Sequence, residues 1–307
     1  MPSPDSVVWA EGPWTHREIS ANGMRFHAVE SGEGPLVVLL HGFPQFWWAM
    51  REPLTQIAAA GYRCVAPDLR GYGGSDKPPR GYDAVTLAAD VAGLIRALGG
   101  REAVLVGHDW GGFAAWTTAA LHPGLVRGLV ILSAPHPLRA RAALFTDPGG
   151  QLRASKPLLA FQLPWWPERA LVARTGERVA QLLQAWSVAP WADDEALRRY
   201  REHICIPHVA HSALEYFRWW MRSQFRPDGA RFARLLRRCR IRVPTLQVHG
   251  DGDPYVLPRT AAGSGRYVDG WYSWRVVEGA GHFLTEEKPK LVCQEVLHWL
   301  DELDRGR

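Results

Sequence analysis

Short apolar runs recur along the chain and alternate with longer amphipathic segments. Several of the runs are rich in β-branched residues and lack polar alternation, which is typical of strands buried on both faces of a parallel sheet. The runs span residues 24–29, 36–40, 63–67, 103–107, 126–132, 245–248 and 273–277, and helices are expected at 51–60, 86–98, 112–122 and 288–303. This alternation predicts an α/β fold, and the two strands before the first helix predict an antiparallel edge.

The alternation stops after residue 135 and resumes near residue 241. The segment between shows no convincing strand and carries helical periodicity at 195–203 and 210–223. We therefore expect an α/β core in two sequence pieces, 1–135 and 241–307, with a helical lid (cap) domain of residues 136–240 inserted between two strands of one sheet. The lid holds the tryptophans Trp165, Trp166, Trp186, Trp191, Trp219 and Trp220, which are expected to roof a site.

Composition excludes several classes of protein. A chain of 307 residues that is 47% hydrophobic and 22% charged is long enough for a hydrophobic core and is not disordered. The net charge is +5, and much of the excess lies at residues 231–242. The spacing of arginine and leucine there is helical, which favours a solvated helix face, and no nucleic-acid-binding motif accompanies it. No nucleic-acid partner is expected.

Features of other protein classes are also missing from the sequence. The cysteines Cys64, Cys205, Cys239 and Cys293 lie far apart, so neither a disulfide framework nor a metal site is expected. No basic-then-apolar leader opens the chain, and its longest apolar runs, about five to seven residues, are far shorter than a membrane span. We expect a cytoplasmic protein without membrane contact, metal or cofactor. The sequence leaves open whether the chain forms a homodimer.

The sharpest chemical signal is the segment 104–112 (VLVGHDWGG). An apolar strand ends at Gly107 and a helix begins near Gly111, so Asp109 occupies a tight strand-to-helix turn between small residues. Such a turn holds its central side chain at the carboxyl edge of the sheet, beside a helix N-terminus that favours an anion. Asp109 could instead be a simple helix N-cap, but further motifs favour a nucleophile.

Together with these motifs, the turn resembles the nucleophile elbow of the α/β-hydrolase family. The segment 41–44 (HGFP) follows a strand where that family places its oxyanion loop, and 279–283 (GAGHF) offers His282 as the base. The segment 248–254 (VHGDGDP) offers the acid, either Asp253 or Asp251, and the family pattern points to Asp253. The order nucleophile, acid, histidine is that of the family, and the resemblance covers essentially the whole chain. His41 and His108 are expected to hold these loops by hydrogen bonds.

An aspartate at the elbow resembles two branches of this family, the epoxide hydrolases and the haloalkane dehalogenases. A carboxylate suits displacement at a saturated carbon, which would give an alkyl ester on Asp109. Water activated by His282 would then attack the carboxyl carbon, and the backbone N–H groups of Phe43 and Trp110 would form the oxyanion hole. The segments 41–44 and 68–78 look closer to epoxide hydrolases.

The lid departs from the pattern of that branch. Epoxide hydrolases use lid tyrosines to protonate the ring oxygen, and the segment 213–218 resembles their tyrosine-bearing helix. Phe217 stands where the phenol is expected, with Tyr216 one step earlier, and no tyrosine lies near Phe161.

We nevertheless expect an epoxide hydrolase for a small apolar epoxide. Tyr216 is the expected proton donor, and Tyr200, His208 and His211 are alternatives to it. Trp47, Phe161 and Phe217 are expected to contact the substrate. A haloalkane dehalogenase and a non-catalytic ligand-binding protein are the alternative functions.

Overall fold

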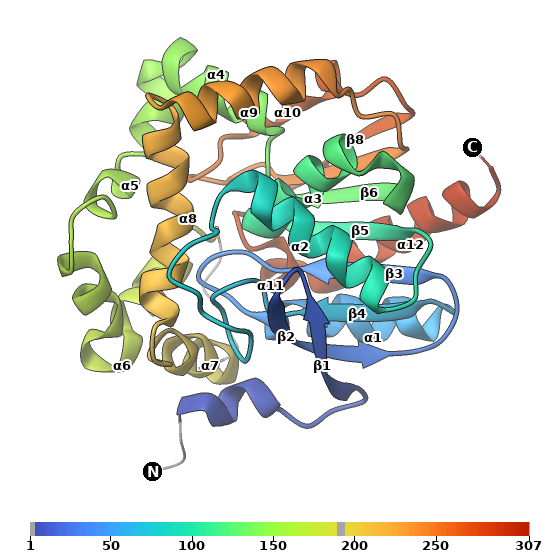
Figure 1. Cartoon of the computed structure of the whole chain (residues 1–307), viewed down its shortest axis with the longest axis horizontal. Coiled ribbons are helices and arrows are strands. Elements are labelled where there is room, and N and C mark those ends of the chain that lie inside the picture. Colours follow the sequence, from blue (N-terminus) through green and yellow to red (C-terminus); the bar gives the residue numbers. More distant parts are fainter. Residues whose placement is uncertain (1–3, 189–193, 307) are drawn as a thin grey trace.

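The computed structural model describes residues 4–188 and 194–306 of the chain. In this part, eight strands form a single sheet in the order β1-β2-β4-β3-β5-β6-β7-β8 (Figure 1). The strands are β1 (Thr15–Ala21), β2 (Met24–Ser31), β3 (Leu36–Leu40), β4 (Arg63–Pro67), β5 (Ala103–His108), β6 (Val126–Leu132), β7 (Thr245–Gly250) and β8 (Tyr272–Val277). All seven predicted strands are present, and the α/β prediction is confirmed.

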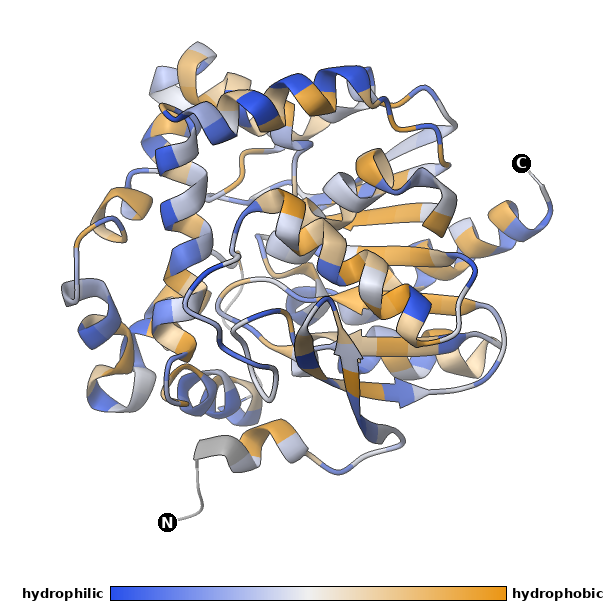
Figure 2. Ribbon diagram, in the orientation of Figure 1, coloured by the Kyte–Doolittle hydropathy of each residue, from blue (hydrophilic) through white to orange (hydrophobic). Residues whose placement is uncertain are grey.

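The sheet is parallel from β4 to β8 and antiparallel at one edge, where β2 pairs with both β1 and β4. Strands β3, β5 and β7 are buried along their whole length, and Figure 2 shows the central strands as predominantly apolar. The prediction missed β1. Its sequence THREISA is mostly exposed, and only Ile19 and Ala21 are buried, so the apolar signal of an edge strand is weak there.

Helices cover both faces of the sheet. The long core helices are α1 (Arg51–Ala59), α2 (Ala84–Ala97), α3 (Trp110–Leu121) and α12 (Pro289–Asp304), with short helices α10 (Pro258–Ala262) and α11 (Leu284–Glu287). Helices α2 and α3 pack together on one face, and α1 and α12 pack together on the other (Figure 1). Short 3-10 turns occupy Pro4–Trp9, Trp47–Met50, Pro123–Leu125 and Gly263–Tyr267, and a π-turn occupies Pro148–Leu152.

The described residues between β6 and β7 are helical. They form α4 (Pro137–Thr146), α5 (Pro157–Ala160), α6 (Trp166–Ala185), α7 (Asp194–Ile204), α8 (Val209–Ser223) and α9 (Pro227–Arg238). These inserted helices lie beyond the carboxyl ends of the parallel strands (Figure 1), and all fall within the segment predicted as a lid. The predicted helices at 195–203 and 210–223 are α7 and α8.

Most of the basic run at 231–242 lies on α9. In α9 the arginines Arg234, Arg237 and Arg238 are exposed, while Phe232 and Leu236 are buried, as expected of a solvated helix face.

None of the helices in the described ranges combines the length and apolar character that a membrane crossing requires.

Candidate active site

Asp109 stands between β5 and α3 with an unusual backbone conformation. Its φ of 48° and ψ of −113° are strained for a non-glycine residue, and the side chain is only 9% exposed. The turn requires glycine at position 111, because a Cβ there would lie 2.1 Å from the carbonyl oxygen of Leu40. The predicted elbow therefore forms, with the carboxylate raised at the carboxyl edge of the sheet.

The predicted oxyanion loop contacts this carboxylate. The backbone N–H of Phe43 donates to Oδ2 of Asp109 at 2.9 Å. Trp110 is the first residue of α3, so its backbone N–H has no acceptor within the helix. Both N–H groups thus belong to the segments next to the Asp109 carboxyl group, and their role as an oxyanion hole stays a prediction.

His282 and Asp253 lie together next to Asp109, as the sequence predicts. Nδ1 of His282 lies 2.8 Å from Oδ2 of Asp253, and Nε2 lies 3.7 Å from Oδ1 of Asp109. The other oxygen of Asp253 accepts the backbone N–H groups of Tyr255 and Val256, each at 2.9 Å. Asp251 is exposed, so the geometry favours Asp253 as the partner of the histidine.

The charges of this group depend on one another. Burial disfavours a charged imidazole, but the carboxylates of Asp253 and Asp109 outweigh that effect and raise the pKa of His282 to about 10. Burial also opposes ionisation of Asp109, yet the attraction between its carboxylate and the His282 imidazole keeps the pKa of Asp109 below its usual value. His282 therefore carries its proton at neutral pH beside the ionised carboxyl group of Asp109.

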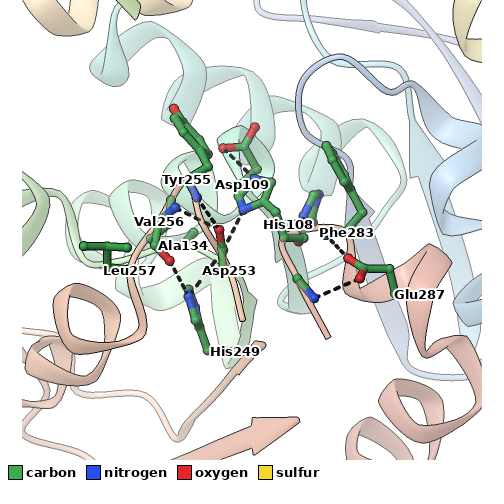
Figure 3. Close-up of polar contacts among 12 residues, drawn as sticks. His108, Asp109, Ala134, His249, Asp253, Tyr255, Val256, Leu257, Phe283 and Glu287 are labelled. Atoms are coloured by element: carbon green, nitrogen blue, oxygen red, sulfur yellow. Dashed lines mark hydrogen bonds and ion pairs between the residues drawn. The ribbon is translucent and has the colours of Figure 1, made fainter. Parts of the chain in front are cut away.

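The loop that carries His282 is held on several sides. His108 stays neutral because burial lowers its pKa to about 4, and its Nε2–H donates to the carbonyl of His282 at 2.8 Å. The N–H of His282 donates to the carbonyl of Trp186, just after α6, at 2.8 Å. Glu287 accepts the N–H groups of Gly281 and Phe283 (Figure 3).

The predicted structural histidines both act through hydrogen bonds. His41 accepts the N–H of Leu69 at 2.9 Å through Nε2, which ties the oxyanion loop to the segment after β4. His108 holds the His282 loop rather than the elbow to which it belongs. Both side chains are fully buried.

A cavity opens at Asp109 and runs beneath the inserted helices. Its apolar wall comes from Trp110, Phe113, Leu144, Leu158 and Trp220. Polar side chains also reach it, namely Ser133, Gln151, Ser155, Tyr255 and Thr260. The cavity therefore suits an apolar molecule with few polar atoms.

Tyr216, the predicted proton donor, does not line this cavity. Its side chain is fully buried, and its hydroxyl donates to the backbone carbonyl of Arg70 at 2.7 Å. The helix α8 is thus oriented with Phe217, not Tyr216, over Phe43. Phe217 thus occupies the place that the phenol was expected to take, and the prediction of Tyr216 as proton donor is not supported by this geometry.

The alternative donors are also engaged elsewhere. The hydroxyl of Tyr200 donates to Glu286. His211 is half exposed and pairs with Glu168 at 3.1 Å, and His208 is an exposed residue at the start of α8. None of the three lines the cavity.

The three predicted substrate contacts lie outside the cavity wall as well. Trp47 is fully buried, and its indole N–H donates to the carbonyl of Val8 at 2.8 Å, so it packs in the core. Phe161 and Phe217 pack edge-to-face on each other and on Phe43. They form an apolar plug over the oxyanion loop and leave the cavity to other residues.

The tryptophans of the inserted segment divide into separate groups. Trp220 lines the cavity, and Trp186 stacks on Tyr255 with ring centroids 4.1 Å apart. Trp165 and Trp166 are 75% and 60% exposed, so they do not roof the site. Trp219 packs on Phe113 and Phe232, and Trp191 lies outside the described residues.

Sequence reasoning missed Tyr255 and Glu287. Tyr255 lies two residues after Asp253, and a loop residue so close to the acid is forced toward the same edge of the sheet, which was an available signal. Glu287 follows the histidine by five positions and had no motif to mark it. Across the described residues, no group of three or more His, Cys, Asp or Glu side chains could hold a metal ion.

Comparison with known proteins places this site in a family. Residues 35–289 match the family described as alpha/beta hydrolase fold. The chain is 33% identical to epoxide hydrolase 3 of Xenopus tropicalis over 95% of this chain and 79% of that protein. It is 32% identical to epoxide hydrolase A of Mycobacterium tuberculosis, over 95% and 99%.

Solved structures agree with the sequence relatives. The crystal structure of epoxide hydrolase VrEH1 from Vigna radiata matches with a TM-score of 0.80 at 26% identity, over 94% of this chain and 99% of that one. Cfl2 from Burkholderia cenocepacia matches with a TM-score of 0.81 at 28% identity, over 94% and 96%. By fold, sequence and the order of its motifs, the chain belongs to the epoxide hydrolase family of the α/β hydrolases.

Proposed function

We propose that this protein is an epoxide hydrolase that opens a small apolar epoxide to a vicinal diol through a covalent ester on Asp109. The observation that carries the proposal is the position of the Asp109 carboxylate, which lies on the cavity wall, accepts the Phe43 N–H and faces His282. We further propose that Asp109, Asp253 and His282 act as nucleophile, acid and base, and that the inserted helices act as the lid.

In the first step, a carboxylate oxygen of Asp109 attacks a ring carbon and the carbon–oxygen bond of the ring breaks. The lowered pKa of Asp109 keeps the carboxylate ionised at neutral pH. Oδ2 is held by Phe43, which leaves Oδ1, on the side of His282, as the attacking atom. The electron pair of the broken bond moves to the ring oxygen, which needs a proton.

In the second step, the ester changes the state of the histidine. Esterification removes the negative charge of Asp109, which is one of the two charges that hold a proton on His282. The pKa of His282 therefore falls, the imidazolium releases its proton to water in the site, and the neutral residue becomes a base; it regains a proton when the carboxyl group of Asp109 is set free again. It then takes a proton from water, and the resulting hydroxide adds to the carboxyl carbon of Asp109. The oxyanion forms beside the N–H groups of Phe43 and Trp110, where each such donor is worth roughly 100- to 1,000-fold in rate.

A single turnover in heavy-oxygen water tests this route. Because water attacks the aspartate carbon, the label should appear in the peptide that contains Asp109, and the first diol released should be unlabelled. Label in the diol with none in Asp109 would show that water opens the ring directly.

One observation favours a second candidate, a haloalkane dehalogenase. The indole Nε1 of Trp110 is buried and makes no hydrogen bond with any residue that the structure describes, and Trp110 lines the cavity beside Asp109. An N–H in this position could stabilise a departing halide. Bromide release from short bromoalkanes, without diol formation from epoxides, would support that activity. Binding of both substrate classes without turnover would support a ligand-binding role.

A further inference from the structure

Opening an epoxide ring requires a proton donor near the nucleophile, and a neutral phenol is well suited to that task. All eight tyrosines of the chain lie in the described residues, so the placement of each hydroxyl is known. Five hydroxyls donate to acceptors away from the cavity, namely those of Tyr62, Tyr82, Tyr200, Tyr216 and Tyr272. These phenols are not free to serve the substrate.

Two of the remaining three tyrosines lie apart from the cavity wall. Tyr72 is fully buried against His41, His203 and Tyr216. Its hydroxyl makes no hydrogen bond with a described residue, and burial together with the charge of Asp109 raises its pKa. Tyr267 stacks on His136. Neither lines the cavity at Asp109. Tyr255 is therefore the tyrosine whose side chain shares the cavity wall with Asp109.

Tyr255 is held rigidly in this position. Its ring stacks on Trp186 with centroids 4.1 Å apart and meets His282 edge-on with centroids 5.0 Å apart. Its N–H donates to Asp253 at 2.9 Å, and its carbonyl accepts the side-chain amide of Gln151 at 2.9 Å. In Figure 3 the ring rises beside Asp109 with its hydroxyl at the free end. That hydroxyl has no hydrogen-bond partner in the described part of the chain.

The surroundings keep this phenol protonated. Burial opposes the phenolate, and the negative charges of Asp109 and Asp253 oppose it further, so the pKa of Tyr255 lies well above its usual value. A tyrosine with such a raised pKa is not ionised in the resting enzyme and cannot act as a base there. It is a hydrogen-bond donor whose proton is still available to a strongly basic alkoxide.

We propose that Tyr255, from the loop that carries Asp253, is the catalytic acid of ring opening. The proposal deepens the proposed function and rests on the ester of Asp109. As Asp109 attacks and the ring bond breaks, the ring oxygen takes the phenolic proton of Tyr255 and becomes the first hydroxyl of the diol. Hydrolysis of the ester consumes one water. One of its protons completes the second hydroxyl, and the other restores the phenol, so the cycle closes with epoxide plus water giving diol.

Tyr255→Phe isolates the hydroxyl, because phenylalanine keeps the stacking on Trp186 and the contact with His282. The rates of ester formation and of ester hydrolysis are measured separately in single turnovers, by rapid quench and intact-protein mass. We expect ester formation to slow by roughly 100- to 10,000-fold, while hydrolysis of a preformed ester changes by no more than about threefold. Ester formation at the wild-type rate, or a loss confined to hydrolysis, would overturn the proposal.

Two matched variants sharpen the test. Tyr62→Phe removes a hydroxyl that bonds Asp304 at the end of α12 and should leave both rates unchanged. Tyr216→Phe removes the phenol predicted from the sequence, and a loss of ester formation there, with Tyr255→Phe unaffected, would assign the acid to Tyr216 instead. Similar thermal unfolding of all three variants shows that the folds are intact.

Substrate chemistry separates proton donation from positioning. A trifluoromethyl-substituted oxirane has a less basic leaving oxygen than its methyl counterpart, so the loss caused by Tyr255→Phe should be smaller with the fluorinated substrate. An equal loss with both would contradict the role of acid. If the wild-type protein forms no ester with any epoxide, the proposed function itself is wrong. If Tyr255→Phe forms the ester as fast as the wild type, only the assignment of Tyr255 is wrong.

Discussion

Nε2 of His282 lies 3.7 Å from Oδ1 of Asp109, too far for a hydrogen bond and close enough for strong attraction between their charges. No hydrogen bond between the two side chains therefore has to break before Asp109 attacks the substrate. Their relationship changes when Asp109 becomes an ester, because the attraction disappears and the histidine becomes a base. The first two predictions test the two sides of this relationship.

Replacing His282 with glutamine should trap the ester. Glutamine cannot take a proton from water, whereas Asp109 keeps its carboxylate and its contact with Phe43. Intact-protein mass spectrometry after incubation with an epoxide should show an increase equal to the mass of one substrate. The double variant Asp109→Asn, His282→Gln should show none, and an adduct in that variant would place the attachment on another residue.

Asp109→Asn should change how stability depends on pH. The pKa of His282 is raised from 6.5 to about 10, so its contribution to stability is complete below about pH 6.5 and is lost as pH rises through about 10. Asparagine removes one of the charges that raise this pKa. We expect the wild type to lose more unfolding free energy than Asp109→Asn over this range, as measured by urea denaturation.

Glu33→Gln is the control for this measurement, since Glu33 lies exposed in the loop after β2. It should parallel the wild type throughout. Parallel curves for the wild type and Asp109→Asn would instead show that the charge of Asp109 does not act on His282.

Gly42→Ala should slow ester formation by more than the accompanying loss of folded protein can account for. An added Cβ at this position would lie 2.5 Å from the Cβ of Asp109, so the nucleophile or the oxyanion loop must move. A displacement near 1 Å in such a site lowers the rate by roughly 100-fold. Gly149→Ala, whose Cβ would meet no atom within 4 Å, should keep the wild-type rate. A normal single-turnover rate for Gly42→Ala would contradict the assignment of this loop.

Leu144→Trp should restrict the substrate range. Leu144 lies on α4 and lines the cavity, so the larger ring would fill space that a bulky epoxide needs. We expect KM to rise at least tenfold for an aryl epoxide and to change little for a two- or three-carbon epoxide. Leu235→Trp on the exposed face of α9 is the matched control, and equal effects of the two variants on KM would show that this cavity does not bind substrate.

The sequence predicted the parts of the site that depend on the backbone. Asp109 lies on a turn that only flanking glycines allow, and Asp253 and His282 follow strands whose carboxyl ends share one edge of the sheet. Local sequence is sufficient to place such residues. It also predicted the long core helices and the buried strands, since both follow from apolar periodicity, whereas the exposed β1 lacked that signal and α6 (Trp166–Ala185) was not predicted.

The parts that depend on side-chain packing were not predictable in this way. Whether Tyr216 or Phe217 faces Asp109 depends on the rotation of α8, and that rotation is set by contacts such as the hydrogen bond from Tyr216 to the carbonyl of Arg70. Trp47 was expected to contact the substrate, but its indole N–H donates to the carbonyl of Val8, and this distant partner keeps the ring in the core. No local pattern encodes these distant partners.

Trp186 belongs to the inserted segment but contacts two residues of the core. Its carbonyl accepts the N–H of His282, and its indole ring stacks on the ring of Tyr255. The inserted helices are therefore not an exchangeable module of substrate selectivity. A chimaera that receives this segment from a relative must also receive a carbonyl and an aromatic ring at the same place, or it alters the proton chemistry together with the specificity. Substitutions intended to change substrate selectivity should therefore be made in α4 and in the part of α8 that lines the cavity, and should leave Trp186 in place.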